Sequence, residues 1–172
     1  MLYPGEKISP GSLIYKVRLH PEGQSNFEYP TDGLLQINGA VSKTELGGPK
    51  QLDANGNQCL LVIKNGKATG ATIGRMTGIQ SVVREYSKYG PNAKVSLEVA
   101  VYPYSHKDGK FSAPSDSGSI FVDGEGRLVG LLTGGFGTTV STDVTYITPY
   151  FWLEKRVKEA FPDCFLYPVV DF

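Results

Sequence analysis

Between Cys59 and Ile147 the sequence alternates short runs of β-branched and aromatic residues with groups of turn-forming residues. This alternation is typical of short antiparallel strands, because glycine, proline, asparagine and aspartate end strands and reverse the chain. The composition agrees, since the 172-residue chain holds 21 glycines, 11 prolines and 10 tyrosines but only 2 methionines. The pattern predicts a mostly β protein.

The strongest local signal is Asn65-Gly66, a pair that favours a two-residue hairpin turn. The turn Asp123-Gly124-Glu125-Gly126 predicts a second reversal. Six or so short antiparallel strands followed by a helix suit a closed or nearly closed β-barrel better than a βαβ fold. Strands are expected at residues 59–64, 67–76, 79–86, 95–102, 119–122, 127–133 and 144–147.

After the last strand the apolar period changes to that of a helix. Thr148 can cap this helix and Pro149 can open it, because the first helical position needs no backbone N–H. Glu154 and Lys158 lie one turn apart on the other face. The expected docking face consists of Tyr150, Leu153, Val157, Ala160 and Phe161.

Residues 1–58 differ from the rest, because they are rich in turn clusters and contain few apolar runs. Only Leu13–Leu19 and Gly33–Val41 are predicted as strands in this segment. It could not form a core by itself. We therefore predict an irregular N-terminal segment over 1–58 and a compact domain over 59–172.

Charge and cysteine content restrict the partners and the location. Seventeen basic and seventeen acidic residues give a net charge of zero, which argues against nucleic acid or an anionic membrane as a partner. The sequence shows no signal peptide or membrane-spanning run, so a cytoplasmic location is expected. Cys59 and Cys164 are expected to be plain thiols, although a bridge between them stays open, and no metal site or cofactor is predicted.

One segment has the composition of a catalytic loop, Ala113-Pro114-Ser115-Asp116-Ser117-Gly118-Ser119, just before an apolar strand. A tight turn of small residues would expose the Ser117 hydroxyl and leave space for a substrate carbonyl. The N–H groups of Ser115 and Ser117 could then face the same oxygen and form an oxyanion hole, which serves acyl transfer. The alternative is a serine- and glycine-rich loop that only leads into a strand.

Downstream, Leu131-Leu132-Thr133-Gly134-Gly135 forms a strand end where an extended peptide could pair its backbone. These features resemble the C-terminal barrel of trypsin-like serine peptidases of the chymotrypsin fold (PA clan), with their Gly-Asp-Ser-Gly-Gly or Gly-Asp-Ser-Gly-Ser motif. Lys67–Gly74 also looks like the Thr-Gly-x-Thr-x-Gly stretch that opens this barrel. The resemblance covers roughly residues 59–161, and in style it is closest to trypsin-like proteins of fungal genomes.

The resemblance implies a six-stranded chymotrypsin-like β-barrel, the second barrel only, with residues 1–58 as a linker from a first barrel. It implies that Ser117 is the nucleophile and that Ser115, Asp116 and Ser117 make up the oxyanion loop, in which the Asp116 carboxylate orders the loop. It also implies that a peptide or protein substrate binds to the strand formed by Thr133, Gly134 and Gly135.

Two departures from the family pattern stand out. A serine hydroxyl needs a base, and the family's Thr-Ala-x-His stretch is absent. The two histidines, His20 and His106, are expected in exposed segments and are not assigned as the base. The second departure is Ser115, where the family has glycine; a side chain there costs about 1–2 kcal/mol if the position needs a positive φ.

The sequence thus predicts a serine-endopeptidase-like domain with little or no peptidase activity alone, because the His and Asp of the triad must come from elsewhere. The alternatives are a catalytically dead barrel that binds peptides or another chain, and an unrelated β-sandwich with an accidental serine loop. A first-barrel segment or a second copy is the expected protein partner. Phe111, six residues before Ser117, is either the floor of an apolar or blocked specificity pocket or a core residue.

Overall fold

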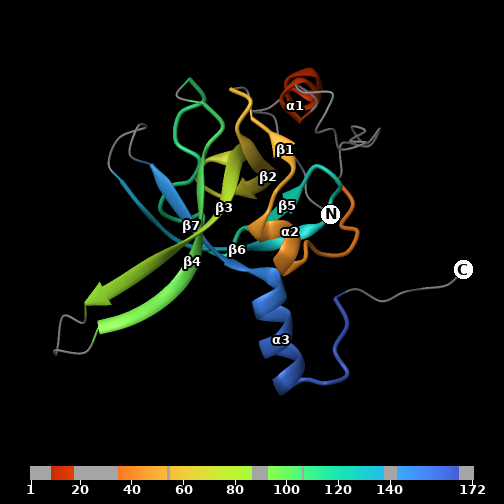
Figure 1. Ribbon diagram of the computed structural model, residues 1–172, viewed down its shortest axis with the longest axis vertical. Coiled ribbons are helices and arrows are strands. Elements are labelled where there is room, and N and C mark those ends of the chain that lie inside the picture. Colours follow the sequence, from red (N-terminus) through yellow and green to blue (C-terminus); the bar gives the residue numbers. More distant parts are fainter. Residues whose placement is uncertain are drawn as a thin grey trace, which may run out of the picture.

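The computed structural model describes residues 9–17, 35–53, 55–86, 93–105, 107–137 and 143–166. Six antiparallel strands form a closed ring, because each pairs with the next and the last, β5, pairs back to β2. This ring confirms the six-stranded antiparallel barrel (Figure 1). In ring order the strands are β2 (Gln58–Gly66), β3 (Gly70–Tyr86), β4 (Ala93–Pro103), β7 (Val144–Pro149), β6 (Leu128–Phe136) and β5 (Ile120–Asp123).

Strand β2 is buried on both faces, which explains its nearly continuous apolar sequence. Leu60 and Val62 pack into one hydrophobic cluster, together with Met76, Val101 and Phe121 among others. Leu61 and Ile63 alternate with them and pack into a second cluster. The short strand β1 (Gln51–Leu52) pairs with the start of β2 and lies outside the ring.

The N-terminal residues cover this second cluster. Leu13 of helix α1 (Pro10–Val17) is 1% exposed and packs there with Leu35. The predicted strand at Leu13–Leu19 is therefore wrong over the described residues. The N–H of Ser12 donates to the Ser9 hydroxyl, and Pro10 occupies the first helical position, so the segment carries a helix start signal.

Residues 35–47 pass along the barrel without forming the predicted strand at Gly33–Val41, of which residues 33–34 lie outside the described part. Ala40 makes a single parallel bridge to Leu128. Helix α2 (Lys43–Gly47) begins with a capping box between Ser42 and Glu45. It places Leu46 in the first cluster. Residues before position 58 thus contribute to the core, and the domain boundary at 58 stays a prediction.

The hairpin between β2 and β3 is confirmed, but the turn is not at Asn65-Gly66. Gly66 still pairs with Gly70, and residues 67–69 make the turn. A Cβ on Gly66 would lie 2.4 Å from a carboxylate oxygen of Asp116. The glycine is therefore required by the close approach of Asp116, and not by a two-residue turn.

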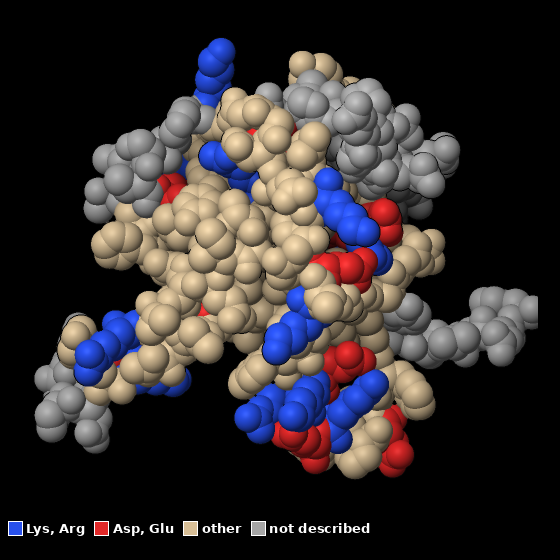
Figure 2. Space-filling view, in the orientation of Figure 1, with Lys and Arg blue, Asp and Glu red and all other residues tan. Residues whose placement is uncertain are grey.

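Helix α3 (Tyr150–Ala160) confirms the predicted helix, but it is not docked along its length. Pro149 is the N-cap residue, and the Thr148 hydroxyl donates to Glu98 instead of capping the helix. Only the first turn packs on the core, through Tyr150 and Phe151. The rest extends away from the barrel (Figure 1), and its far end carries clustered charges (Figure 2), among them the expected Lys158–Glu154 ion pair at 3.0 Å.

Both cysteines are free thiols, Cys59 buried and Cys164 partly exposed. Burial, with a smaller contribution from the Asp53 carboxylate, raises the pKa of the Cys59 thiol to about 12, so this thiol is protonated at neutral pH. Among the described residues, no helix is long and apolar enough to cross a membrane.

Candidate active site

Ser117 lies in an exposed turn that is fixed to the barrel on its C-terminal side. The N–H of Gly118 donates to the carbonyl of Leu132 at 2.9 Å, and the N–H of Leu132 donates to the carbonyl of Ser119 at 3.0 Å. These two bonds extend the pairing of β5 with β6 up to Gly118, the residue after Ser117. The hydroxyl is therefore presented to solvent from a turn held at the end of a strand.

Two backbone amides in this turn remain available. No described residue accepts a hydrogen bond from the N–H of Ser115 or Ser117, whereas the N–H of Asp116 between them donates to the carbonyl of Ala113 at 3.1 Å. Ser115 has φ = 82° and is the only described non-glycine residue with a positive φ. This left-handed conformation turns the chain between the two amides, as in an anion-binding nest. The arrangement could hold a carbonyl oxygen as it becomes negatively charged.

The Asp116 side chain points into the protein and holds the turn from beneath. Its carboxylate accepts hydrogen bonds from the Thr69 hydroxyl (2.6 Å) and from the amides of Ala68 (2.7 Å) and Ala113 (3.1 Å). It also pairs with the Lys64 ammonium at 3.2 Å, and both side chains are fully buried. The sequence missed Lys64, although a lysine within the apolar run of β2 is a signal of a buried partner.

These donors decide the charge of Asp116. Burial alone would raise the pKa of the carboxyl, but the Thr69 hydroxyl, the two amides and the Lys64 charge outweigh it and lower the pKa to about 2. Asp116 is therefore ionised at neutral pH and acts as an anchor for the turn. It is turned away from the solvent side of Ser117 and does not serve there as a base.

A cavity of about 240 Å³ lies next to Ser117. One wall is the end of β6, with Gly134, Gly135 and the exposed Phe136. Asp143, which precedes β7 and is 8% exposed, is also among the lining residues. Its Oδ2 accepts a hydrogen bond from the N–H of Phe111 at 3.0 Å. Sequence reasoning gave no signal for Asp143, because it is 26 residues from Ser117 and belongs to no motif.

The end of β6 also offers an open edge. Beyond Leu132 the described residues of β6 pair with β7 on one side only. Thr133 lies in a bulge, and its hydroxyl donates to the carbonyl of Tyr146 at 3.2 Å. The backbone of Thr133, Gly134 and Gly135 is thus placed to pair with an extended peptide that passes Ser117.

Phe111 is a core residue and does not line this cavity. It is 1% exposed, and its ring lies 5.4 Å from the ring of Phe121. The hypothesis of a pocket floor at Phe111 is therefore wrong, and the alternative of a core residue holds. The preceding residue, Lys110, is exposed and lines the cavity instead.

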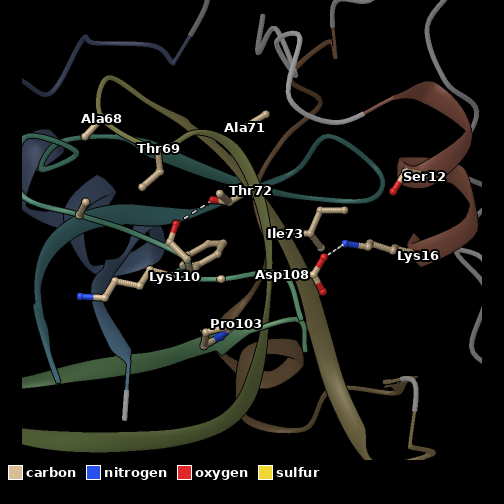
Figure 3. A pocket seen from close by; sticks show the side chains of 13 residues that line it. Ser12, Lys16, Ala68, Thr69, Ala71, Thr72, Ile73, Pro103, Asp108 and Lys110 are labelled. Carbon is tan, nitrogen blue, oxygen red and sulfur yellow. Dashed lines mark hydrogen bonds and ion pairs between the residues drawn. The ribbon is translucent and has the colours of Figure 1, made fainter. Parts of the chain in front are cut away.

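A second cavity of about 520 Å³ lies behind the turn, between helix α1 and residues 103–113 (Figure 3). Lys16 of α1 forms an ion pair with Asp108 across it, and the Thr72 hydroxyl donates to the carbonyl of Phe111 at 2.8 Å. Figure 3 shows Lys110 pointing away from α1. Because Lys110 lines both cavities, residues 110–113 form the wall between them.

Neither histidine can be placed relative to Ser117, because His20 and His106 lie outside the described residues. The described part of the chain therefore contains a hydroxyl, two amides, an anchored carboxylate and a binding cavity, but no histidine.

The conformation of Ser115 gives a first testable expectation. Ser115→Gly should raise the free energy of unfolding by about 1 kcal/mol, because glycine adopts a positive φ without steric cost. Gly118, in the same turn at φ = 82°, is the matched control. Gly118→Ala should lower the free energy by a similar amount, and chemical denaturation measures both. A change of the same sign in the free energy of unfolding of both variants would contradict the positive φ of Ser115.

No protein-family model and no curated protein matches the chain. Solved structures do resemble it. The chymotrypsin of Cellulomonas bogoriensis is 19% identical with a TM-score of 0.42, over 74% of this chain and 52% of that one. A glutamic-acid-specific serine protease is 19% identical with a TM-score of 0.46, over 82% and 61%. The Nocardiopsis protease is 16% identical with a TM-score of 0.46, over 77% and 58%.

The chain thus spans between about half and three fifths of the length of these three proteases. A similarity this low concerns the fold alone, so the function has to be argued from the geometry around Ser117.

Proposed function

We propose that the chain is a serine-endopeptidase-like domain that supplies one half of an acyl-transfer site. The observation that supports this most is the turn at Ser117, where the exposed hydroxyl lies in the same turn as the amides of Ser115 and Ser117, neither of which donates to a described residue. A substrate carbonyl would accept hydrogen bonds from the Ser115 and Ser117 amides while the Ser117 hydroxyl attacks its carbon.

The proposed reaction needs a base that the described residues around Ser117 do not supply. A histidine oriented by an aspartate, both from another segment or chain, would take the hydroxyl proton and later donate it to the leaving amine. Without them only the oxyanion site and substrate binding remain, worth about 10³–10⁴-fold in rate over water. The domain alone is therefore expected to bind peptides and to show little or no hydrolysis.

The cavity beside Ser117 supports a preference for peptides with a cationic side chain. Asp143 presents a nearly buried carboxylate whose Oδ1 has no described hydrogen-bond partner. An arginine or lysine side chain that reaches it would form a charge-assisted hydrogen bond. Lys110 lines the same cavity, and its positive charge opposes this preference by repulsion.

The alternative function is a catalytically dead barrel that binds peptides or proteins along β6. The cavity beside Ser117 and the open edge of β6 support it, because neither needs a base to bind a ligand.

Two measurements separate the two functions. Parent and Ser117→Ala proteins should bind a peptide with equal affinity, since the hydroxyl adds little to binding. Treatment with a fluorophosphonate, in the presence of a barrel that carries the His and Asp, should modify the parent at Ser117 and leave Ser117→Ala unmodified. Peptide binding without any adduct at Ser117 would refute acyl transfer and leave the binding module.

A further inference from the structure

The outer halves of β3 and β4 leave the barrel as a two-stranded arm (Figure 1). In this arm residues 80–86 pair with residues 93–99 in antiparallel register. A bulge between Met76 and Gln80 separates the arm from the barrel part of β3. Over these residues no described strand other than β4 pairs with β3, and β4 joins β7 only from Val99 inward. An isolated two-stranded ribbon is marginally stable in water, so the arm needs a partner for one of its faces.

The two faces of the arm differ sharply. One face, here called the arm face, carries four exposed apolar side chains, and its central pair Val82 and Leu97 are direct cross-strand partners at 69% and 60% exposure. The opposite face is mostly polar, with Ser81, Glu85, Lys94, Ser96 and Glu98. The four apolar residues of the arm face are Val82, Tyr86, Val95 and Leu97.

The charge on the arm face restricts what can cover it. Arg84 is its only charged residue, and the guanidinium lies over the ring of Tyr86, 5.2 Å from the ring centre. The arm face holds no carboxylate, so it does not select a basic ligand. Its single cation, Arg84, already stacks on the Tyr86 ring and therefore attracts an acidic ligand only weakly. Its complement is another apolar sheet face, which an identical arm supplies.

We propose that the arm face is the contact surface between two copies of this chain, packed face to face about a two-fold axis with the arms antiparallel. In this arrangement Val82 and Leu97 of one copy pack near the same pair of the other. The two arm tips point in opposite directions, so the two Arg84 side chains lie on opposite sides of the centre and do not repel each other closely.

The available area sets the strength of this contact. An apolar side chain of this size, about two-thirds exposed, offers roughly 100 Å², so two arm faces with the Arg84 stems would bury about 1,000 Å² in total. Stable interfaces bury about 1,200–2,000 Å². The dimer is therefore of the weak class, and it should dissociate on dilution.

The test is sedimentation velocity over about a hundredfold range of concentration. The parent should move from the 18.7 kDa monomer toward a dimer as the concentration rises. Leu97→Lys should remain monomeric, because it places a charge in the centre of the contact. Ser96→Lys, on the opposite face of the same arm, adds the same charge and should dimerise as the parent does. Thermal unfolding verifies that both variants stay folded.

Disulfide cross-linking is a second measurement, and it uses variants that trap the dimer instead of weakening it. Under mild oxidation Leu97→Cys should form a disulfide-linked dimer, and Ser96→Cys should not. A parent that stays monomeric over the whole range would overturn the proposal. So would a Leu97→Lys protein that still dimerises, or a dimer that is lost only when Trp152 on the exposed part of α3 is replaced by lysine.

Discussion

Replacing Asp116 with alanine is expected to lower the free energy of unfolding by about 3–5 kcal/mol. The substitution leaves the Lys64 ammonium without its buried counter-ion and leaves the Thr69 hydroxyl and the amides of Ala68 and Ala113 without their acceptor. An unpaired buried charge and unsatisfied buried donors are both costly. Urea denaturation monitored by circular dichroism of the β-sheet measures the loss.

The Lys64–Asp116 pair can be isolated with a double-mutant cycle. Lys64→Met and Asp116→Asn each remove one charge, and the double variant removes both, so the double loss should be smaller than the sum of the two single losses by about 1–3 kcal/mol. Lys158→Met on the exposed helix α3, which breaks the surface pair with Glu154, is the control and should cost less than about 1 kcal/mol. Additive losses at positions 64 and 116 would contradict a buried pair.

The same carboxylate predicts how stability responds to acid. The pKa of Asp116 is lowered to about 2 in the folded protein, below the unfolded value of about 3.9. A lowered folded pKa contributes stability that is fully present above pH 4 and is lost as the pH falls toward 2. The contribution is about 2–3 kcal/mol. The stability difference between the parent and Asp116→Asn should therefore shrink between pH 4 and pH 2, and a constant difference would show that Asp116 is not the group that titrates.

The second large effect concerns the ligand. Asp143→Asn is expected to weaken the binding of a peptide ending in arginine by roughly ten- to hundredfold, because a charge-assisted hydrogen bond becomes a neutral one. Asparagine keeps an oxygen that can accept the hydrogen bond from the N–H of Phe111, so the cavity should keep its shape. Isothermal titration calorimetry measures the affinity.

Two controls make this result specific to charge. A peptide ending in citrulline has nearly the shape of the arginine peptide without the charge, and Asp143→Asn should hardly change its binding. Lys110→Gln removes the positive charge from the cavity lining and should strengthen arginine binding severalfold. Equal losses for arginine and citrulline peptides would show that Asp143 acts only on the structure.

The sequence predicted the parts of the fold that depend on local patterns. The alternating runs gave the strands of the ring, and the turn at Asp123–Gly126 is held as expected, because the Asp123 carboxylate accepts from the amides of Glu125 and Arg127. It failed where distant residues decide the structure. Gly66 serves the approach of Asp116, and the apolar period of α3 does not reveal that only its first turn has a surface to pack on.

The candidate site likewise has parts that local patterns predict and parts that depend on residues far apart in the sequence. The small residues around Ser117 predicted a turn with an exposed hydroxyl. The steric cost expected of a side chain at position 115 applies, because Ser115 has a positive φ of 82°. Lys64 of β2 and Asp143, just before β7, are far from the turn in sequence, so their roles depend on the closure of the barrel. A single sequence contains no spacing rule for such contacts.

We expect the amides of Ser115 and Ser117 together to bind an oxygen that carries negative charge. The most direct test is a ¹H–¹⁵N NMR titration with an acetylated tripeptide that ends in an arginine carboxylate, compared with the same peptide as an amide. The Ser115 and Ser117 resonances should shift together with one affinity for the carboxylate. The Gly118 amide, which already donates to Leu132, should shift much less. Resonances of Ser115 and Ser117 that stay in place while the peptide binds elsewhere, or that respond equally to both peptides, would contradict the claim.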